Sequence, residues 1–250
     1  MTLKTMICLI MDRSGSMQNL RQDVVGGVNN FIEQQKKKPD PASIAFVRFD
    51  SPSDTPVIER FRPMQPLAEV KPLTLDEYDP RGWTPLLDAV GKTIVDLDED
   101  WKREQPDRAI VVIVTDGQEN ASEEYTKPKI RSLIQAREAS DQWTFIFLGA
   151  NVDAFAEASA LGIRSVNTAS YTASSAGMGS TYSTISDTVG RMRSTGDTMA
   201  HNLGGTITEQ GDVISAKGTV APPPADLAAA WVPPAPIQTD QDVWTPPPAA

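Results

Sequence analysis

The feature that most constrains this chain is an apolar run that stops at an acid. Residues 6–11 read Met-Ile-Cys-Leu-Ile-Met and are followed directly by Asp12. An unbroken apolar run is typical of a strand buried on both faces, as in a parallel sheet that has helices on each side. Asp12 would then lie at the carboxyl end of that strand, where open α/β sheets bind their ligands. We therefore expect a ligand site around Asp12.

Further along the chain, helical and extended patterns alternate. Apolar residues at spacings of three and four predict helices at residues 20–38, 85–101, 127–139 and 152–161. Short apolar runs predict strands at residues 5–11, 43–49, 57–61, 109–114, 143–148 and 163–166. This order predicts an α/β fold, with a doubly wound, mostly parallel central sheet of about six strands and helices on both faces. Residues 57–61 alternate apolar and charged side chains, which favours one antiparallel edge strand there.

The composition changes after this pattern, so we predict three parts. Residues 1–168 form the α/β domain. Residues 169–203 add one helix packed on that domain, because Met178, Tyr182, Ile185, Val189 and Met192 recur at helical spacing. Residues 204–250 are a disordered tail rich in proline and alanine. Two tryptophans of the tail, Trp231 and Trp244, lie near proline runs and are either docking contacts or mere composition.

Charge and residue usage exclude several classes of function. The net charge is −10 and no basic cluster exceeds residues 36–38, which disfavours nucleic acid and anionic membranes as partners. Cys8 is the only cysteine and His201 the only histidine, so a disulfide, a histidine-dependent triad or a histidine-rich zinc site is not expected. The apolar run near the N-terminus is too short for a signal peptide or a membrane span, and we expect a cytoplasmic protein.

Three segments bring oxygen ligands toward one edge of the predicted sheet. Asp12 and Asp116 each follow an apolar strand, and in the usual strand order of this fold those two strands are neighbours at the switch point. Thr84 ends the long loop of residues 62–83 and precedes Pro85 at a helix start, where it is also a good N-cap. The predicted set is two carboxylates and three hydroxyls: Asp12, Ser14, Ser16, Thr84 and Asp116. Such a set suits a hard divalent cation, although each residue alone also fits an ordinary cap or turn.

This pattern resembles the von Willebrand factor A (VWA) domain with its metal-ion-dependent adhesion site (MIDAS). The family pattern is Asp-x-Ser-x-Ser, then a Thr, then an Asp, and the five residues match it in order. The flanking residues 82–89 and 115–117 also look like those of the family. The resemblance covers roughly residues 3–168 and implies bound Mg²⁺, or else Mn²⁺ or Ca²⁺. It implies that Ser14, Ser16 and Thr84 ligate directly, while Asp12 and Asp116 often act through water.

The resemblance also implies a function. An open position on the metal would accept an Asp or Glu of a protein partner, so we expect a non-enzymatic interaction module. The family also supplies subunits of larger complexes, and a compact VWA domain with a low-complexity tail is typical of bacteria and their phages. We expect Arg13 to face solvent beside the arriving acid.

The sequence leaves two alternatives open. The chain could be a scaffold that acts through its C-terminal helix and tail. It could also be a phosphotransferase with Asp12 as nucleophile. The second is disfavoured because position 14 is Ser rather than a second acid, and because no lysine lies in the loops after the two central strands until Lys127.

Overall fold

The computed structural model describes residues 2–53, 55–150 and 153–215. Within them the strands form one eight-stranded sheet in the order β3-β2-β1-β4-β5-β6-β7-β8. The strands are β1 (Thr5–Asp12), β2 (Ala42–Asp50), β3 (Val57–Pro66), β4 (Arg108–Thr115), β5 (Trp143–Gly149), β6 (Thr168–Tyr171), β7 (Gly205–Ile207) and β8 (Val213–Ser215). The helices are α1 (Arg21–Lys36), α2 (Leu86–Glu104), α3 (Lys127–Glu138), α4 (Ala154–Ala160) and α5 (Ser175–Thr195).

The predicted fold class is confirmed, but the size of the sheet is not. Neighbouring strands from β2 through β1 and β4 to β7 pair in parallel. The edge strands β3 and β8 pair antiparallel, so the described sheet has eight strands and two antiparallel edges rather than about six and one. Strands β7 and β8 have three residues each, which is too short for an apolar pattern to be recognised.

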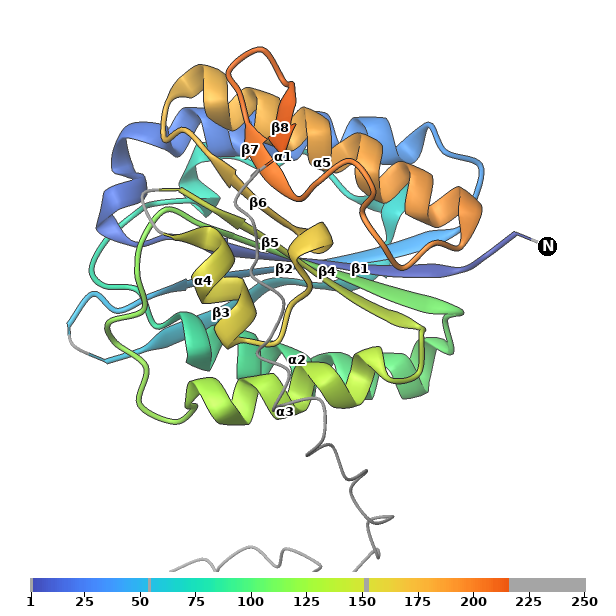
Figure 1. The fold of residues 1–250 in the computed structure, drawn as a ribbon, viewed down its shortest axis with the longest axis horizontal. Coiled ribbons are helices and arrows are strands. Elements are labelled where there is room, and N and C mark those ends of the chain that lie inside the picture. Colours follow the sequence, from blue (N-terminus) through green and yellow to red (C-terminus); the bar gives the residue numbers. More distant parts are fainter. Residues whose placement is uncertain (1, 54, 151–152, 216–250) are drawn as a thin grey trace, which may run out of the picture. The chain divides into compact units, whose positions relative to one another are not determined.

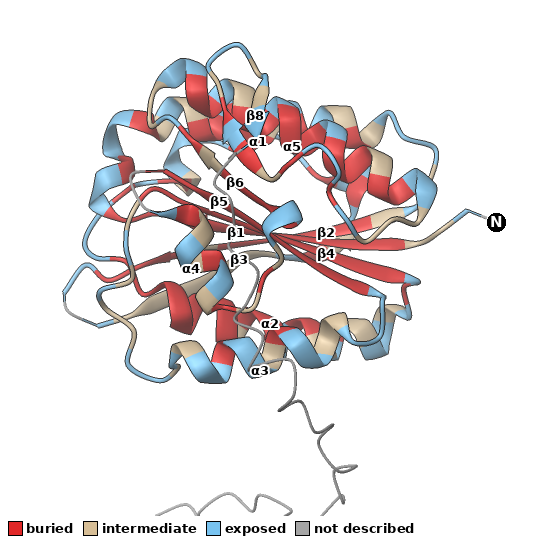
Figure 2. Ribbon diagram, in the orientation of Figure 1, coloured by how far each residue is buried: buried red, intermediate tan, exposed pale blue. Residues whose placement is uncertain are grey.

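Helices cover both faces of the sheet, which explains why β1 is apolar throughout. Ile7, Leu9 and Met11 face a core shared with α1 and α5. Met6, Cys8 and Ile10 face a second core shared with α2, α3 and α4. Figure 1 shows α1 and α5 on one side of the sheet and α2 and α3 on the other, and Figure 2 shows the buried strands between them. Alternate side chains of each central strand therefore pack into different cores.

Cys8 behaves as the sequence suggests. Its side chain is buried in the second core. Burial raises the pKa of the Cys8 thiol to about 12, because a thiolate would lose its hydration there. The thiol therefore stays protonated and packs as a small apolar group.

The C-terminal part of the described chain departs from the prediction. The strand expected at residues 163–166 is wrong, because Ser165–Asn167 form a 3₁₀ turn and the strand is β6, which starts at Thr168. Within residues 169–203 the structure has one helix, α5, which packs against α1. The sheet then continues with β7 and β8, so the expected boundaries at 168 and 203 both fall inside it, and the tail cannot begin at 204. Residues 216–250, with Trp231 and Trp244, lie outside the described residues.

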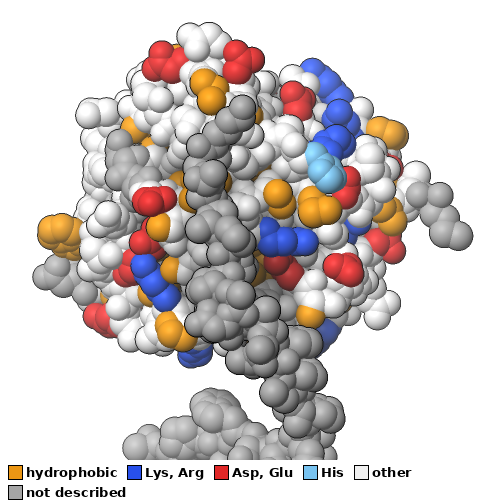
Figure 3. Space-filling model, viewed as in Figure 1, with side chains coloured by type: hydrophobic (Ala, Val, Ile, Leu, Met, Phe, Trp, Pro, Cys, Tyr) orange, Lys and Arg blue, Asp and Glu red, His pale blue; other side chains and the backbone are white. Residues whose placement is uncertain are grey.

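Two features of the surface bear on function. Over the ranges that the structure describes, no helix is long and apolar enough to cross a membrane. On the face drawn in Figure 3, acidic and basic side chains are interspersed rather than gathered by sign.

Candidate metal centre

The site begins where the two central strands end. β1 pairs in parallel with β4, and Met11 lies opposite Val114. The next residues, Asp12 and Thr115, are therefore neighbours, and Thr115 Oγ1 donates a hydrogen bond to Asp12 Oδ2 at 2.6 Å. Asp116 follows directly. The predicted adjacency of the two acid-bearing strand ends is thus present in the structure.

A chain of hydrogen bonds joins the two strand ends. Ser14 N donates to Asp12 Oδ1 at 2.7 Å, which folds the loop back over the end of β1. The hydroxyl oxygens of Ser14 and Ser16 are 3.1 Å apart. Ser16 Oγ then donates to Asp116 Oδ1 at 2.5 Å. Four of the five predicted residues therefore form one connected group.

Thr84 reaches the same place, but not as a helix cap. α2 begins at Leu86 with Pro85 as the flanking residue, and the Thr84 side chain accepts no hydrogen bond from its first turn, so the N-cap role predicted for Thr84 is wrong. Pro85 has φ −81° and ψ 63°, which is not helical, and this places Thr84 one residue too far from the helix. Its hydroxyl makes no hydrogen bond to any described residue and remains free for the site.

Asn120 holds Thr84 in position, and sequence reasoning missed it. Thr84 N donates to Asn120 Oδ1 at 2.8 Å. Asn120 N donates in turn to the Thr84 carbonyl oxygen at 3.2 Å. The only sequence signal for this role is a side-chain amide shortly after the Asp116-Gly117 turn, in a loop with no recognisable motif.

Oxygens of residues 12–16 and of Thr84 surround a common space beside Gly117. A Cβ atom on Gly117 would lie 3.1 Å from Thr84 Oγ1, 3.7 Å from Ser16 Oγ and 3.9 Å from Asp12 Oδ2. A pocket here is lined by Ser14, Ser16 and Thr84 together with Gly82, Trp83, Gly117 and Asn120. In the described ranges, no three His, Cys, Asp or Glu residues are placed to hold a metal. A metal at this place would therefore depend on hydroxyl oxygens as well as carboxylates, and an all-oxygen set of this kind fits Mg²⁺.

The two carboxylates carry an electrostatic cost that a cation would relieve. Asp12 is fully buried, and burial raises its pKa to about 6, although hydrogen bonds from Thr115 and Ser14 act in the opposite direction. Burial also raises the pKa of Asp116. Neither carboxylate forms a salt bridge with a residue that the structure describes. Within the described residues no cation balances this pair, and a bound metal ion would do so.

Two buried tyrosines donate hydrogen bonds to backbone carbonyl groups at the ends of β1 and β4. Tyr78 Oη donates to the Asp12 carbonyl oxygen, and Tyr171 Oη donates to the Thr115 carbonyl oxygen at 3.1 Å. Tyr78 belongs to the long loop after β3, and Tyr171 ends β6. Both carbonyl groups are thereby satisfied inside the protein, and the loops that follow them start from fixed points.

The expectation that Arg13 faces solvent is wrong. Arg13 is 3% exposed, and its guanidinium lies 3.1 Å from Asp50 Oδ1 at the end of β2. Arg81 Nε bonds the other carboxylate oxygen at 2.7 Å. The pairing partner lies 37 residues away in the chain, so the local sequence does not reveal it. Arg13 is a support that joins the Asp12 loop to β2, and it does not meet an arriving ligand.

Two further carboxylates order the loop between β4 and α3. Asp88 accepts hydrogen bonds from three successive backbone N–H groups, those of Glu123, Glu124 and Tyr125, at 2.9, 2.9 and 2.8 Å. Glu119 accepts from Leu87 N at 2.8 Å and from the backbone of residues 121 and 122. In the sequence, Asp88 stands out only as part of the flank of Thr84. Through these hydrogen bonds, Asp88 connects the start of α2 with the loop that carries Asn120.

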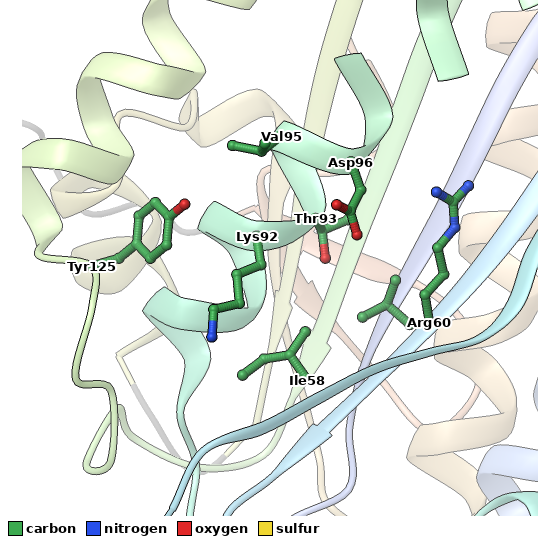
Figure 4. Close-up of a pocket in the computed structure, with 8 residues that line it drawn as sticks. Ile58, Arg60, Lys92, Thr93, Val95, Asp96 and Tyr125 are labelled. Atoms are coloured by element: carbon green, nitrogen blue, oxygen red, sulfur yellow. The ribbon is translucent and has the colours of Figure 1, made fainter. Parts of the chain in front are cut away.

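A separate pocket lies between β3 and α2 (Figure 4). Ile58 and Arg60 line it from β3, Lys92 and Thr93 from α2, and Tyr125 from the loop before α3. None of the five predicted residues takes part. Its cationic groups already have partners, because Lys92 pairs with Glu124 at 2.7 Å and Arg60 pairs with Asp100. We assign no function to this pocket.

No family model and no curated protein sequence matches this chain. Solved structures match at low identity. A von Willebrand factor type A structure from Catenulispora acidiphila is 12% identical with a TM-score of 0.52, over 75% of this chain and 42% of that one. The pilus adhesin SpaC from Lactobacillus rhamnosus GG is 12% identical with a TM-score of 0.56, over 76% and 30%. Proximal thread matrix protein 1 from the mussel byssus is 16% identical with a TM-score of 0.51, over 77% and 46%.

These matches establish the fold and no more. This chain spans less than half the length of each of those three structures. At such identities a common function does not follow from a common architecture. The chain has an α/β fold similar to that of von Willebrand factor type A structures.

Proposed function

We propose that this chain is a VWA-type module that binds a protein partner through a divalent cation held by Asp12, Ser14, Ser16, Thr84 and Asp116. The observation that carries the proposal is the convergence of oxygens beside Gly117. Thr84 Oγ1, Ser16 Oγ and Asp12 Oδ2 all lie within 3.9 Å of the place where a Cβ atom of Gly117 would be, and they come from two segments, residues 12–16 and the loop before α2. Their donor type favours Mg²⁺, with Mn²⁺ or Ca²⁺ as substitutes.

The hydroxyl and carboxylate residues of the proposed centre would have different roles. The hydroxyls of Ser14, Ser16 and Thr84 would hold the metal, and the buried carboxylates of Asp12 and Asp116 would together balance its two positive charges. A bound metal supplies a Lewis-acidic position that an incoming carboxylate can occupy. Thr84 is held by Asn120 and Ser14 by Asp12, so the site is largely formed before a ligand arrives.

We further propose that the chain is not an enzyme. A nucleophilic Asp12 would need an oxygen that is free to attack. Both of its carboxylate oxygens accept hydrogen bonds, from Ser14 N and from Thr115 Oγ1, and the side chain is fully buried. Absence of turnover with generic phosphate esters under Mg²⁺ is the expected result, and turnover lost in Asp12→Asn would contradict it.

A peptide library tests binding even though the partner is unidentified. Short displayed peptides of random sequence with one fixed central Asp are passed over the immobilised full chain in Mg²⁺ and then released with EDTA. We expect retained peptides that EDTA releases, and no such fraction from a matched library with Asn in place of the fixed Asp. Retention that chelator leaves unchanged would refute coordination of the partner's acid by the metal.

Two threonine variants supply the matched comparison. Thr84→Ala removes a hydroxyl of the proposed centre and should abolish the fraction that EDTA releases. Thr93→Ala removes a buried hydroxyl of α2 that has no hydrogen-bond partner among the described residues, and it should leave retention unchanged. Equal loss in both variants would indicate damage to α2 rather than to a metal centre. A chain truncated after residue 215 tests the scaffold alternative, which requires that binding is lost with residues 216–250.

A further inference from the structure

The loop of the proposed metal centre presents a large aromatic side chain to solvent. Trp83 directly precedes Thr84, yet Trp83 is 56% exposed while Thr84 is 3% exposed. An exposed tryptophan has an apolar ring surface that gains from being covered, and tryptophan is enriched among residues that dominate binding energy at interfaces.

The backbone that carries Trp83 is held firmly on both sides. Trp83 N donates to the Ser51 carbonyl oxygen at 3.1 Å, and Gly15 N donates to the Gly82 carbonyl oxygen at 3.0 Å. Gly82 has φ 66°, and a Cβ atom on it would lie 2.1 Å from the Ser51 carbonyl oxygen, so only glycine fits this approach. The backbone that presents the indole is therefore fixed, so a ligand that covers the ring need not order this loop.

A hollow adjoins the indole on the side of the loop after β4. It is lined by Trp83, Asn120, Ala121, Ser122 and Glu123. Trp83 and Asn120 also line the pocket of the metal centre, so the two depressions adjoin each other. Glu123 is exposed and forms no salt bridge within the part of the chain that the structure describes. Its backbone is fixed by Asp88, which accepts a hydrogen bond from Glu123 N at 2.9 Å.

The chemistry of this hollow distinguishes between possible occupants. An aromatic face attracts a cation, most strongly when the ring is tryptophan, and an unpaired carboxylate attracts a cation as well. A purely apolar side chain would cover the indole but would also remove water from Glu123 without compensation. A second acid would be repelled. The charge complement of the hollow is thus a lysine ammonium or an arginine guanidinium.

We propose that the partner presents two opposite charges, an acid to the metal and a neighbouring lysine or arginine to the hollow between Trp83 and Glu123. This inference rests on the proposed function, since it places the basic side chain relative to an acid on the metal. An exposed acidic residue alone is then not sufficient for recognition. The partner must also carry a basic residue next to that acid.

The peptides with a fixed Asp that EDTA releases provide the test. We expect lysine and arginine to be enriched at positions close to the fixed Asp. The same selection on Trp83→Ala and on Glu123→Gln should recover peptides that lack this enrichment. Asp187→Asn is the matched control, because it removes an exposed carboxylate from α5 at a place that lines neither depression. For one enriched peptide, replacing its basic residue by glutamine should lower affinity by about 2-fold to 30-fold.

The outcomes separate the two proposals. If the released peptides show no enrichment of lysine or arginine, the Trp83–Glu123 assignment is overturned. The same holds if Trp83→Ala and Glu123→Gln give the same enrichment as the unaltered chain. In both cases the proposed function still stands. If the unaltered chain retains no peptide that EDTA releases, the proposed function fails, and this inference fails with it. A Mg²⁺ titration and a far-ultraviolet circular dichroism spectrum of each variant establish that it is folded.

Discussion

The buried Asp12 carboxylate makes a quantitative prediction about the metal-free protein. Its pKa is raised from 3.8 to about 6 in the folded state. At about 1.4 kcal/mol per pKa unit, keeping this group ionised near pH 7 costs about 3 kcal/mol of folding free energy. Asp12→Asn removes that charge while keeping a side chain of the same shape. Thr115 Oγ1 can accept from the new amide, so a hydrogen bond between them remains available.

The sign of the pH dependence follows from the direction of the shift. Between about pH 4 and about pH 6, the folded protein retains a proton that the unfolded chain has already released. The stability contributed by this group is therefore present at low pH and declines as pH rises through that window. Without metal, we expect Asp12→Asn to be the more stable protein by up to about 3 kcal/mol near pH 7 and to match the unaltered chain near pH 4.

Urea unfolding in EDTA at several pH values measures this difference, and repetition in Mg²⁺ should reverse the order of the two proteins. Asp50→Asn is the matched control, since Asp50 is also fully buried at the end of a strand but is paired with Arg13 and Arg81. Breaking such a pair should destabilise the protein by about 3–5 kcal/mol with or without metal. An Asp12→Asn variant that is less stable than the unaltered chain in EDTA near pH 7 would refute the reasoning.

Three further predictions concern residues around the centre. Gly117→Ala places a methyl group 3.1 Å from Thr84 Oγ1, and calorimetric titration with Mn²⁺ should show weakened binding while the thermal midpoint in EDTA is nearly unchanged. Asn120→Ala removes the acceptor for Thr84 N, and the same titration should show a loss of affinity of about 10-fold to 100-fold, as for other residues that orient metal ligands; unchanged affinity would mean that Thr84 is positioned without it. Arg13→Met leaves Asp50 with one cationic partner, and urea unfolding should show a loss of about 3 kcal/mol; a fully stable variant would contradict the supporting role of Arg13.

The fold was predictable wherever a strand is buried on both faces. Residues 6–11 are apolar throughout because alternate side chains enter two different cores, as expected of a strand that is buried on both faces. The short strands β7 and β8 gave no such signal. β7 is held by pairing with β6, which is distant in the chain, and β8 pairs only with β7 in a hairpin. Three residues in each strand are too few to show a local periodicity.

The candidate site likewise contains residues that the sequence locates and residues that it does not. Asp12 and Asp116 could be located because each follows a recognisable strand, and Thr84 because it precedes a recognisable helix. The positions of Arg13 and Asn120 depend on partners 37 and 36 residues away, so their surroundings exist only after folding. A charged residue in a loop is expected at the surface by default, and the buried Asp50 reverses that expectation for Arg13.

The most direct test of the metal centre is anomalous scattering from a crystal of the full chain grown with Mn²⁺. We predict one peak beside Gly117, bounded by the hydroxyl oxygens of Ser14, Ser16 and Thr84, and lost from crystals of Thr84→Ala. A folded chain that shows no anomalous peak at this position in Mn²⁺ would contradict the account.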